Sequence, residues 1–533
     1  MGQSFTACCQ KEEIHLESTI HESMNLPSSR MNTIEKQEIV PKIEKKEFKI
    51  KSANYVRQRS CAFSDVYEAL EDVGEGSYGK IIKVRHLFSN ELRVVKVVSK
   101  NSIHKGVSEN DVINEINILK SMDHPNIIKV FEFFSDESNI YIVKEYFNEG
   151  DLFSNLMKLD MNESLICSIM RQIFSAVSYL HSKKVLHGDL KLENILIETQ
   201  PIIDSYVDIK LTDFGCSKIF YNRVCRKFIG TTYYLAPEIL RSEYNEKCDI
   251  WSAGVILYIL LTGRLPFEGS CEKEIIEKIK QKSSVSYDLE EFSHFSKEAI
   301  SVLKMMLIYD YNERPSASEI LKHQWFKNFF VDKSLIHKEE MKKTLNFLRN
   351  CNSRTKFHHA VISFLTHNVE KNEEVKKLAL IFKLLDKDCD GKISIFDLKK
   401  GLEENFKNIT FLEVENIIKN ITYNDECYIE YEEFLSATLD KNMLFTEQKL
   451  KEAFDLFDVK KEGIIHANEI KQVFSREQEV SDEIMTEILS EIQVKMDEDI
   501  EYEAFKKLML EVINENKKKE NCFDSTHNTI ENV

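Results

Sequence analysis

The chain has 533 residues, 42% of them hydrophobic, and a formal net charge of −17. This length exceeds what one hydrophobic core supports, so about three or four folding units are expected. The longest apolar run, residues 253–263, is about half of the ~20 residues that a membrane-spanning helix needs, which excludes a transmembrane protein. The 12 cysteines show no CxxC spacing and no apolar signal stretch begins the chain, which favours a reducing cytosol.

Residues 1–60 are polar and show no sustained periodicity, which predicts a disordered arm. The start of this arm fits a myristoylation signal, because Gly2 follows Met1 and a hydroxyl residue stands at position six. One myristoyl chain binds membranes only marginally, and Cys8 and Cys9 are placed to accept palmitate as a second anchor. We therefore expect the protein at the cytoplasmic face of a membrane; the alternative is a plain flexible leader.

Residues 66–326 change from short strand-like runs to long helical stretches. Runs 67–74, 80–87 and 92–99 are strand-like, and the last two are rich in β-branched residues, whereas residues 169–182 have helical spacing. This order predicts an α+β domain with a small sheet-rich lobe and a larger helical lobe.

Residues 332–367 are basic and amphipathic and contain neither glycine nor proline, which predicts one long helix. Its apolar face carries Ile336, Met341, Leu345 and Leu348. Residues 372–515 then contain four similar helix–loop–helix segments centred near positions 391, 427, 463 and 498, followed by a polar tail over 516–533. From residue 371 onward the chain has 23 basic against 38 acidic residues. This excess is typical of a region that repels nucleic acid, of a solvated surface or of a cation binder, and composition does not choose among these. No nucleic-acid partner is expected.

A glycine-rich segment lies between the first two strand-like runs, at Gly74, Gly76 and Gly79. Positions without side chains let backbone amides approach phosphate oxygens. Lys96 follows in the next strand and Glu115 in the helix after it, an order that holds a lysine against ATP phosphates.

Three further motifs appear in order: His187-Gly188-Asp189-Leu190-Lys191-Leu192-Glu193-Asn194, Asp213-Phe214-Gly215 and Ala236-Pro237-Glu238. Their order and separations resemble eukaryotic protein kinases. With the C-terminal segments, the chain resembles the calcium-dependent protein kinases of plants, ciliates and protozoan parasites over nearly everything after residue 65. The implied fold is a bilobal α+β kinase domain followed by an all-α EF-hand domain similar to calmodulin.

The resemblance implies a serine/threonine kinase that uses ATP and Mg²⁺ to phosphorylate protein substrates. Asp189 would accept the substrate hydroxyl proton and Lys191 would steady the γ-phosphate, while Thr231 bridges these two side chains. Asn194 and Asp213 would hold Mg²⁺.

The family pattern also implies the residues around the nucleotide and the substrate. The expected nucleotide contacts are Val73, Gly74, Gly76, Gly79, Ile81, Lys96, Glu115, Glu145, Phe147 and Leu196. Asp151 and Glu193 stand where related kinases hold a basic residue upstream of the phosphoacceptor, so an Arg/Lys-x-x-Ser/Thr preference is expected. Glu238 and Arg314 resemble a structural ion pair.

Two positions depart from the kinase pattern. Gly188 replaces the arginine that grips an anionic group in the activation segment, and Lys227 occupies the position of that anion. Both halves of this ion pair are absent, so activation-segment phosphorylation is not the expected switch. Lys144 stands at the back of the ATP pocket, where we expect it either to pair with a carboxylate or to extend toward solvent.

The first of the four C-terminal segments has the pattern of a calcium-binding EF-hand loop, with the turn glycine at Gly391. It closes on Asp397, one methylene shorter than the usual glutamate, which puts bidentate coordination in question. The expected calcium ligands are Asp386, Asp388, Asp390, Lys392, Ser394 and Asp397.

The other three hands depart further from a calcium site. Hand two begins with Thr422 and has Cys427 at the glycine position, which puts ion binding in doubt. Hand three places Lys460 where an oxygen ligand belongs, and hand four runs from Gln493 to Ala504 with too few oxygens. We therefore expect hand three to be structural and hand four to hold no ion.

The basic segment 332–367 resembles the family's autoinhibitory junction. We expect it to block the kinase cleft without calcium and to bind the hands when calcium opens them. Alternatively, it packs the domains together permanently. A calcium-regulated kinase, acting as a monomer, is the favoured interpretation; a calcium-independent kinase and a membrane-tethered scaffold with weakened catalysis remain alternatives.

Overall fold

The computed structural model describes residues 55–76, 79–101, 108–199, 206–220, 230–281, 285–288, 290–328, 336–351, 355–369, 372–422, 427–475, 480–495 and 498–511. The acylation candidates and Lys227 lie outside these ranges. Among the described residues, no helix has the length and hydropathy required to cross a bilayer.

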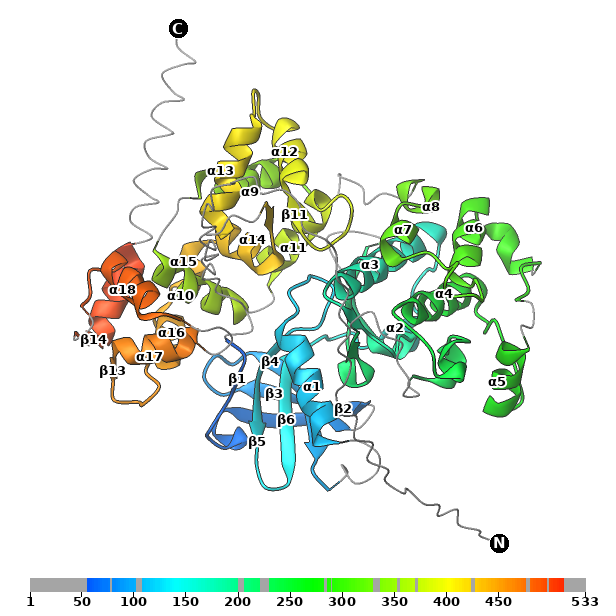
Figure 1. Cartoon of the computed structure of the whole chain (residues 1–533), viewed down its shortest axis with the longest axis horizontal. Coiled ribbons are helices and arrows are strands. Elements are labelled where there is room, and N and C mark those ends of the chain that lie inside the picture. The colour runs from blue at the N-terminus through cyan, green and yellow to red at the C-terminus, as the bar shows by residue number, and fades with distance from the viewer. Residues whose placement is uncertain are drawn as a thin grey trace, which may run out of the picture. The chain divides into compact units, whose positions relative to one another are not determined.

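A mixed sheet with one helix packed on it forms the small lobe (Figure 1). The strand order is β1-β5-β6-β4-β3-β2, in which β1 runs parallel to β5 and the remaining pairs are antiparallel. The elements are β1 (Arg57–Gln58), β2 (Tyr67–Gly76), β3 (Gly79–His86), β4 (Leu92–Ser99), α1 (Glu109–Lys120), β5 (Val130–Ser135) and β6 (Asn139–Glu145).

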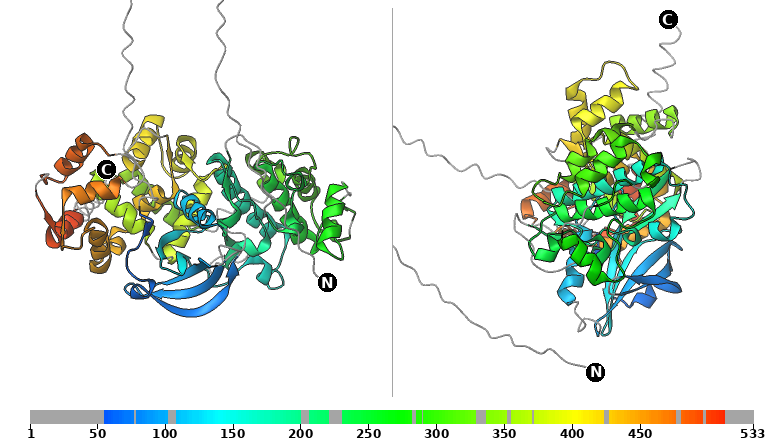
Figure 2. Two further views of the ribbon diagram at one scale, coloured as in Figure 1. Left: turned by 60° about the horizontal axis from the view of Figure 1, so that its bottom comes forward. Right: turned by 90° about the vertical axis from the view of Figure 1, so that its right-hand side faces the viewer.

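Helix α1 begins at a capping box, because the Ser108 hydroxyl accepts a hydrogen bond from the Asp111 amide while the Asp111 carboxylate accepts one from the Ser108 amide. Its buried face carries Val112, Ile116 and Leu119, and also the ionisable Glu115. The strands β2 and β3 form the antiparallel ribbon that can be followed in Figure 2. The sheet and α1 therefore form a rigid support for the groups between them.

The large lobe is mainly helical and is built around α3, most of whose residues are buried. Helix α4 is apolar all round, as expected for a helix in the centre of a domain. The helices are α2 (Leu152–Asn155), α3 (Glu163–Ser182), α4 (Lys247–Thr262), α5 (Glu272–Lys280), α6 (Lys297–Met306), α7 (Ala317–Leu321) and α8 (Gln324–Asn328). The short strands are β7 (Val185–Leu186), β8 (Ile195–Thr199), β9 (Val207–Leu211) and β10 (Lys218–Ile219).

The expected junction helix is divided into α9 (Lys338–Asn350) and α10 (Lys356–His367). Helix α9 ends where Cys351 adopts an extended backbone, and α10 begins at Thr355, whose hydroxyl accepts a hydrogen bond from the His358 amide. The prediction of one continuous helix was wrong, because a hydroxyl cap inside the segment starts a second helix. Ile336, Leu345 and Leu348 are buried in the core of the EF-hand region, as the amphipathic pattern predicted.

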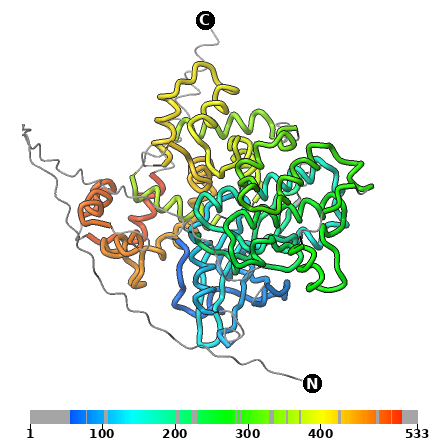
Figure 3. The backbone as a smooth tube through the Cα atoms, turned by 45° about the vertical axis from the view of Figure 1, so that its right-hand side comes forward, coloured from blue at the N-terminus to red at the C-terminus, as the bar shows by residue number. Residues whose placement is uncertain are grey.

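The C-terminal region consists of paired helix–loop–helix hands, seen as separate groups of helices in Figure 3. Strand β11 (Ile393–Ser394) pairs with β12 (Tyr428–Ile429), and β13 (Ile464–Ile465) pairs with β14 (Ile500–Glu501), so each short two-stranded sheet joins two loops. The helices are α11 (Glu373–Leu385), α12 (Ile395–Glu403), α13 (Phe411–Thr422), α14 (Tyr431–Thr438), α15 (Lys441–Leu444), α16 (Glu447–Phe457), α17 (Ala467–Phe474) and α18 (Asp482–Glu491). The predicted fold class is confirmed.

Candidate active site and calcium site

The glycine-rich segment forms the turn between β2 and β3, and residues 77–78 at its tip lie outside the described ranges. A Cβ atom at Gly79 would lie 2.7 Å from the Val97 carbonyl oxygen of β4. A Cβ at Gly76 would lie 3.4 Å from the Lys96 Cε atom. Gly79 is therefore required by close backbone packing, while Gly76 leaves room beside the lysine.

Lys96 of β4 and Glu115 of α1 form a buried ion pair, with 3.0 Å between Lys96 Nζ and Glu115 Oε2. Lys96 Nζ is also 2.8 Å from Oδ1 of Asp213, whose backbone adopts a left-handed φ of 60°. Burial alone would lower the pKa of Lys96, but the carboxylates of Glu115 and Asp213 hold it above the ordinary lysine value. The structure thus brings together three residues that the sequence placed far apart.

Lys144, the departure noted at the back of the pocket, is buried on β6 and pairs with a carboxylate. Its Nζ atom lies 2.6 Å from Glu115 Oε1. Of the two outcomes expected from the sequence, pairing is therefore the one observed.

Asp189, Lys191, Asn194 and Thr231 form a connected cluster. The Thr231 hydroxyl donates to Asp189 Oδ1 at 2.8 Å and accepts from Lys191 Nζ at 2.9 Å. Lys191 Nζ is 2.9 Å from Asp189 Oδ2, and the Asn194 side-chain amide donates to the same oxygen at 3.1 Å. The Asp189 carboxylate is therefore fixed in orientation by three neighbours.

Asp249 of α4 holds the backbone of this catalytic loop and was missed by sequence reasoning. Its carboxylate accepts hydrogen bonds from the His187 amide at 2.8 Å and the Gly188 amide at 2.9 Å. Burial alone would raise the pKa of Asp249, but the hydrogen bond from His181 and these backbone donors hold it below the ordinary value. A single acidic residue inside an otherwise apolar helix was the available signal.

Gly188 has a backbone φ of +80°, in the left-handed region that glycine adopts without steric cost. The position next to Asp189 therefore requires an unusual backbone conformation, which explains why a residue without Cβ fits here. Gly230 packs close by, since a Cβ atom there would lie 2.9 Å from the Gly188 carbonyl oxygen.

Several of the expected nucleotide contacts lie near the point where β6 leads into the large lobe. Leu196 of β8 forms a β-bridge with Asp151. The Phe147 side chain is buried, whereas Val73 on β2 is half exposed. The Asp151 carboxylate caps α2 by accepting from the Ser154 amide at 2.8 Å. Glu193 is exposed. Ile81 and Glu145 lie on β3 and β6 of the small-lobe sheet.

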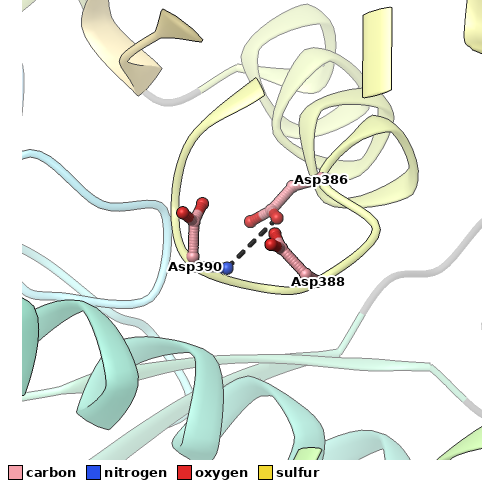
Figure 4. Close-up of side chains that lie close together, drawn as sticks. All are labelled: Asp386, Asp388 and Asp390. Carbon is pink, nitrogen blue, oxygen red and sulfur yellow. Dashed lines mark hydrogen bonds between the residues drawn. The ribbon is translucent and has the colours of Figure 1, made fainter. Parts of the chain in front are cut away.

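Hand one brings Asp386, Asp388 and Asp390 together, and their ligand atoms lie within 4.8 Å of one another (Figure 4). The Asp390 amide donates to Asp386 Oδ1 at 3.2 Å, and Gly391 makes the turn with a φ of +82°. Burial and the neighbouring carboxylates raise the pKa of Asp386 well above its usual value, and the same causes raise that of Asp390 to about 6. This concentration of oxygens and negative charge fits a divalent cation.

The closing residue of hand one, Asp397, is bonded within the loop. Its Oδ2 atom accepts from the Ser394 hydroxyl at 2.6 Å and from the Ser394 amide at 3.1 Å, which caps α12. Its Oδ1 atom is 3.4 Å from the Lys387 amide. Three further calcium ligands stay predictions: the Asp397 and Ser394 side chains and the Lys392 carbonyl.

Hand three keeps the loop backbone and the carboxylates of Asp458 and Glu469, but Lys460 stands where an oxygen ligand belongs. Asp458 accepts hydrogen bonds from the Glu462 amide at 3.0 Å and the Gly463 amide at 2.8 Å. Glu469 accepts from the Lys460 amide at 2.9 Å. Within the described residues, the three aspartates of hand one are the only acidic group close enough to hold an ion.

The hands contact the kinase lobes through a mixed set of interactions. Glu432 of α14 is 2.9 Å from Lys129 Nζ and 2.7 Å from His367 Nδ1, and its amide donates to Asp123 at 3.0 Å. Lys383 of α11 pairs with Asp208. The kinase residues Lys129, Asp123 and Asp208 are at least 175 positions away in the sequence from their partners in the hands, so no local pattern indicated these contacts.

The loop of hand one also touches the kinase domain directly. The Cys389 side chain is buried in the hydrophobic core of the large lobe. A Cβ atom at Gly391 would lie 2.5 Å from His124 Cδ2 and 2.9 Å from Tyr179 Cδ2. The calcium loop and the kinase therefore share a surface.

Comparison with known proteins follows the same division of the chain. A family model described as a protein kinase domain matches residues 67–326, and one described as an EF-hand domain pair matches residues 375–439. Calcium-dependent protein kinase 4 of Plasmodium falciparum (isolate 3D7) is 34% identical over 480 residues, covering 87% of this chain and 90% of that protein. The chain belongs to the calcium-dependent protein kinase family.

Two other relatives support the same membership. Calcium-dependent protein kinase 5 of Plasmodium falciparum (isolate 3D7) is 34% identical over 454 residues, or 84% of this kinase and 78% of that protein. Calcium-dependent protein kinase 3 of Plasmodium berghei (strain Anka) is 33% identical over 433 residues, or 80% of this kinase and 76% of that protein. The resemblance inferred from the motifs is confirmed.

Proposed function

We propose that this chain is a calcium-regulated serine/threonine protein kinase that transfers the γ-phosphate of ATP to protein hydroxyl groups. The observation that carries the proposal is the cluster in which Asp189 is oriented by Thr231, Lys191 and Asn194. The buried pair of Lys96 and Glu115, in which Lys96 also contacts Asp213, is a second supporting observation. Family membership supports the same conclusion.

In this proposal Asp189 accepts the proton of the substrate hydroxyl, and Thr231 fixes the rotamer in which it does so. Lys191 contacts the transferring phosphoryl group, while Lys96, held by Glu115, binds the nucleotide phosphates. The amide oxygen of Asn194 and the carboxylate of Asp213 would hold Mg²⁺; the Asn194 side chain contacts Asp189, and the Asp213 side chain contacts Lys96. Bound Mg²⁺ supplies the positive charge that offsets negative charge on the phosphoryl oxygens.

Calcium regulation is proposed to act through hand one and the junction helices. The three aspartates form a site suited to a divalent cation, and α9 and α10 pack into the core of the hands. In the calcium-free protein we propose that the junction blocks the kinase cleft, and that its binding by the hands releases this block.

Two finer features extend the proposal. Asp151 and Glu193 would select substrates with a basic residue upstream of the phosphoacceptor, because carboxylates pair strongly with arginine. Acylation at Gly2, Cys8 and Cys9 would hold the kinase at the cytoplasmic face of a membrane. A peptide array without basic preference would contradict the first feature, and unchanged partitioning of Gly2→Ala would contradict the second.

The central test is phosphate transfer to a basic serine peptide with Mg²⁺ and ATP, with calcium and with chelator. We expect calcium to raise the rate, and Asp189→Asn to lower kcat by about 10²- to 10⁴-fold because the proton acceptor is lost. No transfer by the wild type would favour the scaffold alternative. Equal rates with calcium and chelator would contradict calcium control.

A further inference from the structure

Lys144 stands in the middle of the small-lobe sheet. It lies on β6, with Val94 of β4 and Val130 of β5 as its partners in register. Its side chain is only 6% exposed. An ammonium group is costly to bury at such a position unless it is paired, so its partner is a clue to its role.

The partner is the carboxylate that also orients the ATP-binding lysine. Glu115 Oε1 lies 2.6 Å from Lys144 Nζ and 3.3 Å from Lys96 Nζ, while Glu115 Oε2 lies 3.0 Å from Lys96 Nζ. Each oxygen of Glu115 thus has its own nearest ammonium. With Asp213 2.8 Å from Lys96, two cations and two anions balance in this buried group.

The two lysines differ in what they must do during a catalytic cycle. Lys96 turns toward the nucleotide phosphates when ATP binds, so its bond to Glu115 is shared with a ligand. Lys144 belongs to a central strand paired on both sides and has no such second task. Its bond to Glu115 can therefore persist through the cycle and hold α1 against the sheet.

We propose that Lys144 is a positioning residue for phosphate transfer, which fixes Glu115, and with it α1, so that Lys96 stays directed at the nucleotide. This inference rests on the proposed kinase function and deepens it. Gly188 has no side chain that could form an ion pair with the activation segment. The ion pair between Lys144 and Glu115 therefore holds the site from inside the small lobe.

The main variant is Lys144→Met, which keeps the length of the side chain and removes its charge. Because the charge-assisted hydrogen bond to Glu115 is lost, we expect kcat to fall about ten- to hundredfold, which corresponds to about 1.4–2.7 kcal/mol. KM for ATP should change by less than about threefold, which is roughly the effect of losing one neutral contact, because the contacts to adenine and to the metal remain. Lys144→Arg, which restores a cation, should recover part of the lost rate.

The dependence of kcat on pH shows whether Lys144 acts through its charge or only through its volume. The groups that face Lys144 are Glu115 from α1, Lys96 from β4 and Asp213 from the loop after β9. Burial outweighs the attraction of the carboxylates and lowers the pKa of Lys144, whereas that of Lys96 is raised. As pH rises and Lys144 loses its proton, wild-type kcat should decline toward that of Lys144→Met, whose profile should lack this step.

The matched control is Lys83→Met, which removes a lysine of the same lobe that is paired with Glu71 at 2.9 Å, outside this group. The kcat of this variant should stay within about twofold of the wild-type value, because an ion pair at the surface contributes little. Hydrogen exchange gives a readout that needs no catalysis: amides of α1 should exchange faster in Lys144→Met than in the wild type or Lys83→Met.

The outcomes are separable. If the wild type transfers no phosphate, the proposed function fails, and hydrogen exchange of α1 alone decides the role of Lys144. If the wild type is active and Lys144→Met matches it in kcat, pH profile and α1 exchange, the positioning role is refuted.

Discussion

Replacing Arg314 by methionine should destabilise the large lobe strongly. The Arg314 guanidinium lies 2.5 and 3.1 Å from the two carboxylate oxygens of Glu238, and both side chains are at most 2% exposed. It also donates to the Ile308 and Lys247 carbonyl oxygens. Arg314→Met would leave the Glu238 carboxylate buried without its cation, which costs about 3–5 kcal/mol.

Urea unfolding followed by tryptophan fluorescence can measure this loss in the full chain. The protein has two tryptophans, Trp251 and Trp325, and both are buried in the large lobe, so the signal reports this lobe and not the hands. With a urea m value of about 3 kcal/mol/M for a domain of this size, the midpoint should fall by about 1–1.7 M.

The double variant Glu238→Leu with Arg314→Met is the control, because it removes both charges together. Replacing a buried ion pair by apolar groups is often close to neutral, so the double variant should regain most of the midpoint. A shift below about 0.3 M in the single variant, or a double variant no more stable than the single one, would refute the argument from the unpaired charge.

Three further outcomes are expected. Asp390→Asn should weaken calcium binding measured by titration calorimetry at least about tenfold, because a ligand charge is lost, and the variant should behave like wild type kept in chelator; unchanged affinity would place the ion elsewhere. Glu432→Gln should raise the calcium concentration for half-maximal activity, because it loses its charge-assisted bonds to Lys129 and His367; an identical calcium curve would show that this contact does not affect regulation. Gly188→Arg should lower kcat without adding dependence on activation-segment phosphorylation, since φ is +80° there; a phosphorylation-dependent gain in rate would contradict this.

The fold class and the members of the catalytic cluster could be predicted because phosphate transfer requires particular side chains in a particular order. Asp189, Lys191, Asn194 and Thr231 are recognisable by motif, and the structure places them within hydrogen-bonding distance. The aspartates of hand one were recognisable for the same reason, since the ligands of an EF-hand are contiguous in sequence.

Contacts between distant segments could not be predicted in this way. Asp249 carried one signal, an acidic side chain inside an apolar helix, but its bonds to the catalytic loop emerged only from the fold. The partner of Lys144 was one of several carboxylates that the sequence allowed. The break between α9 and α10 depends on the cap at Thr355, which a helical hydrophobic pattern does not reveal.

The placement of Gly391 against His124 and Tyr179 makes the ion site and the enzyme parts of one thermodynamic system. A cation that binds more tightly when this surface is assembled must, by reciprocity, strengthen the assembly by the same factor. The calcium sensitivity of this kinase is therefore a property of the whole chain. Hands expressed in isolation would report a different affinity, and the size of that difference would measure how strongly the ion controls the enzyme.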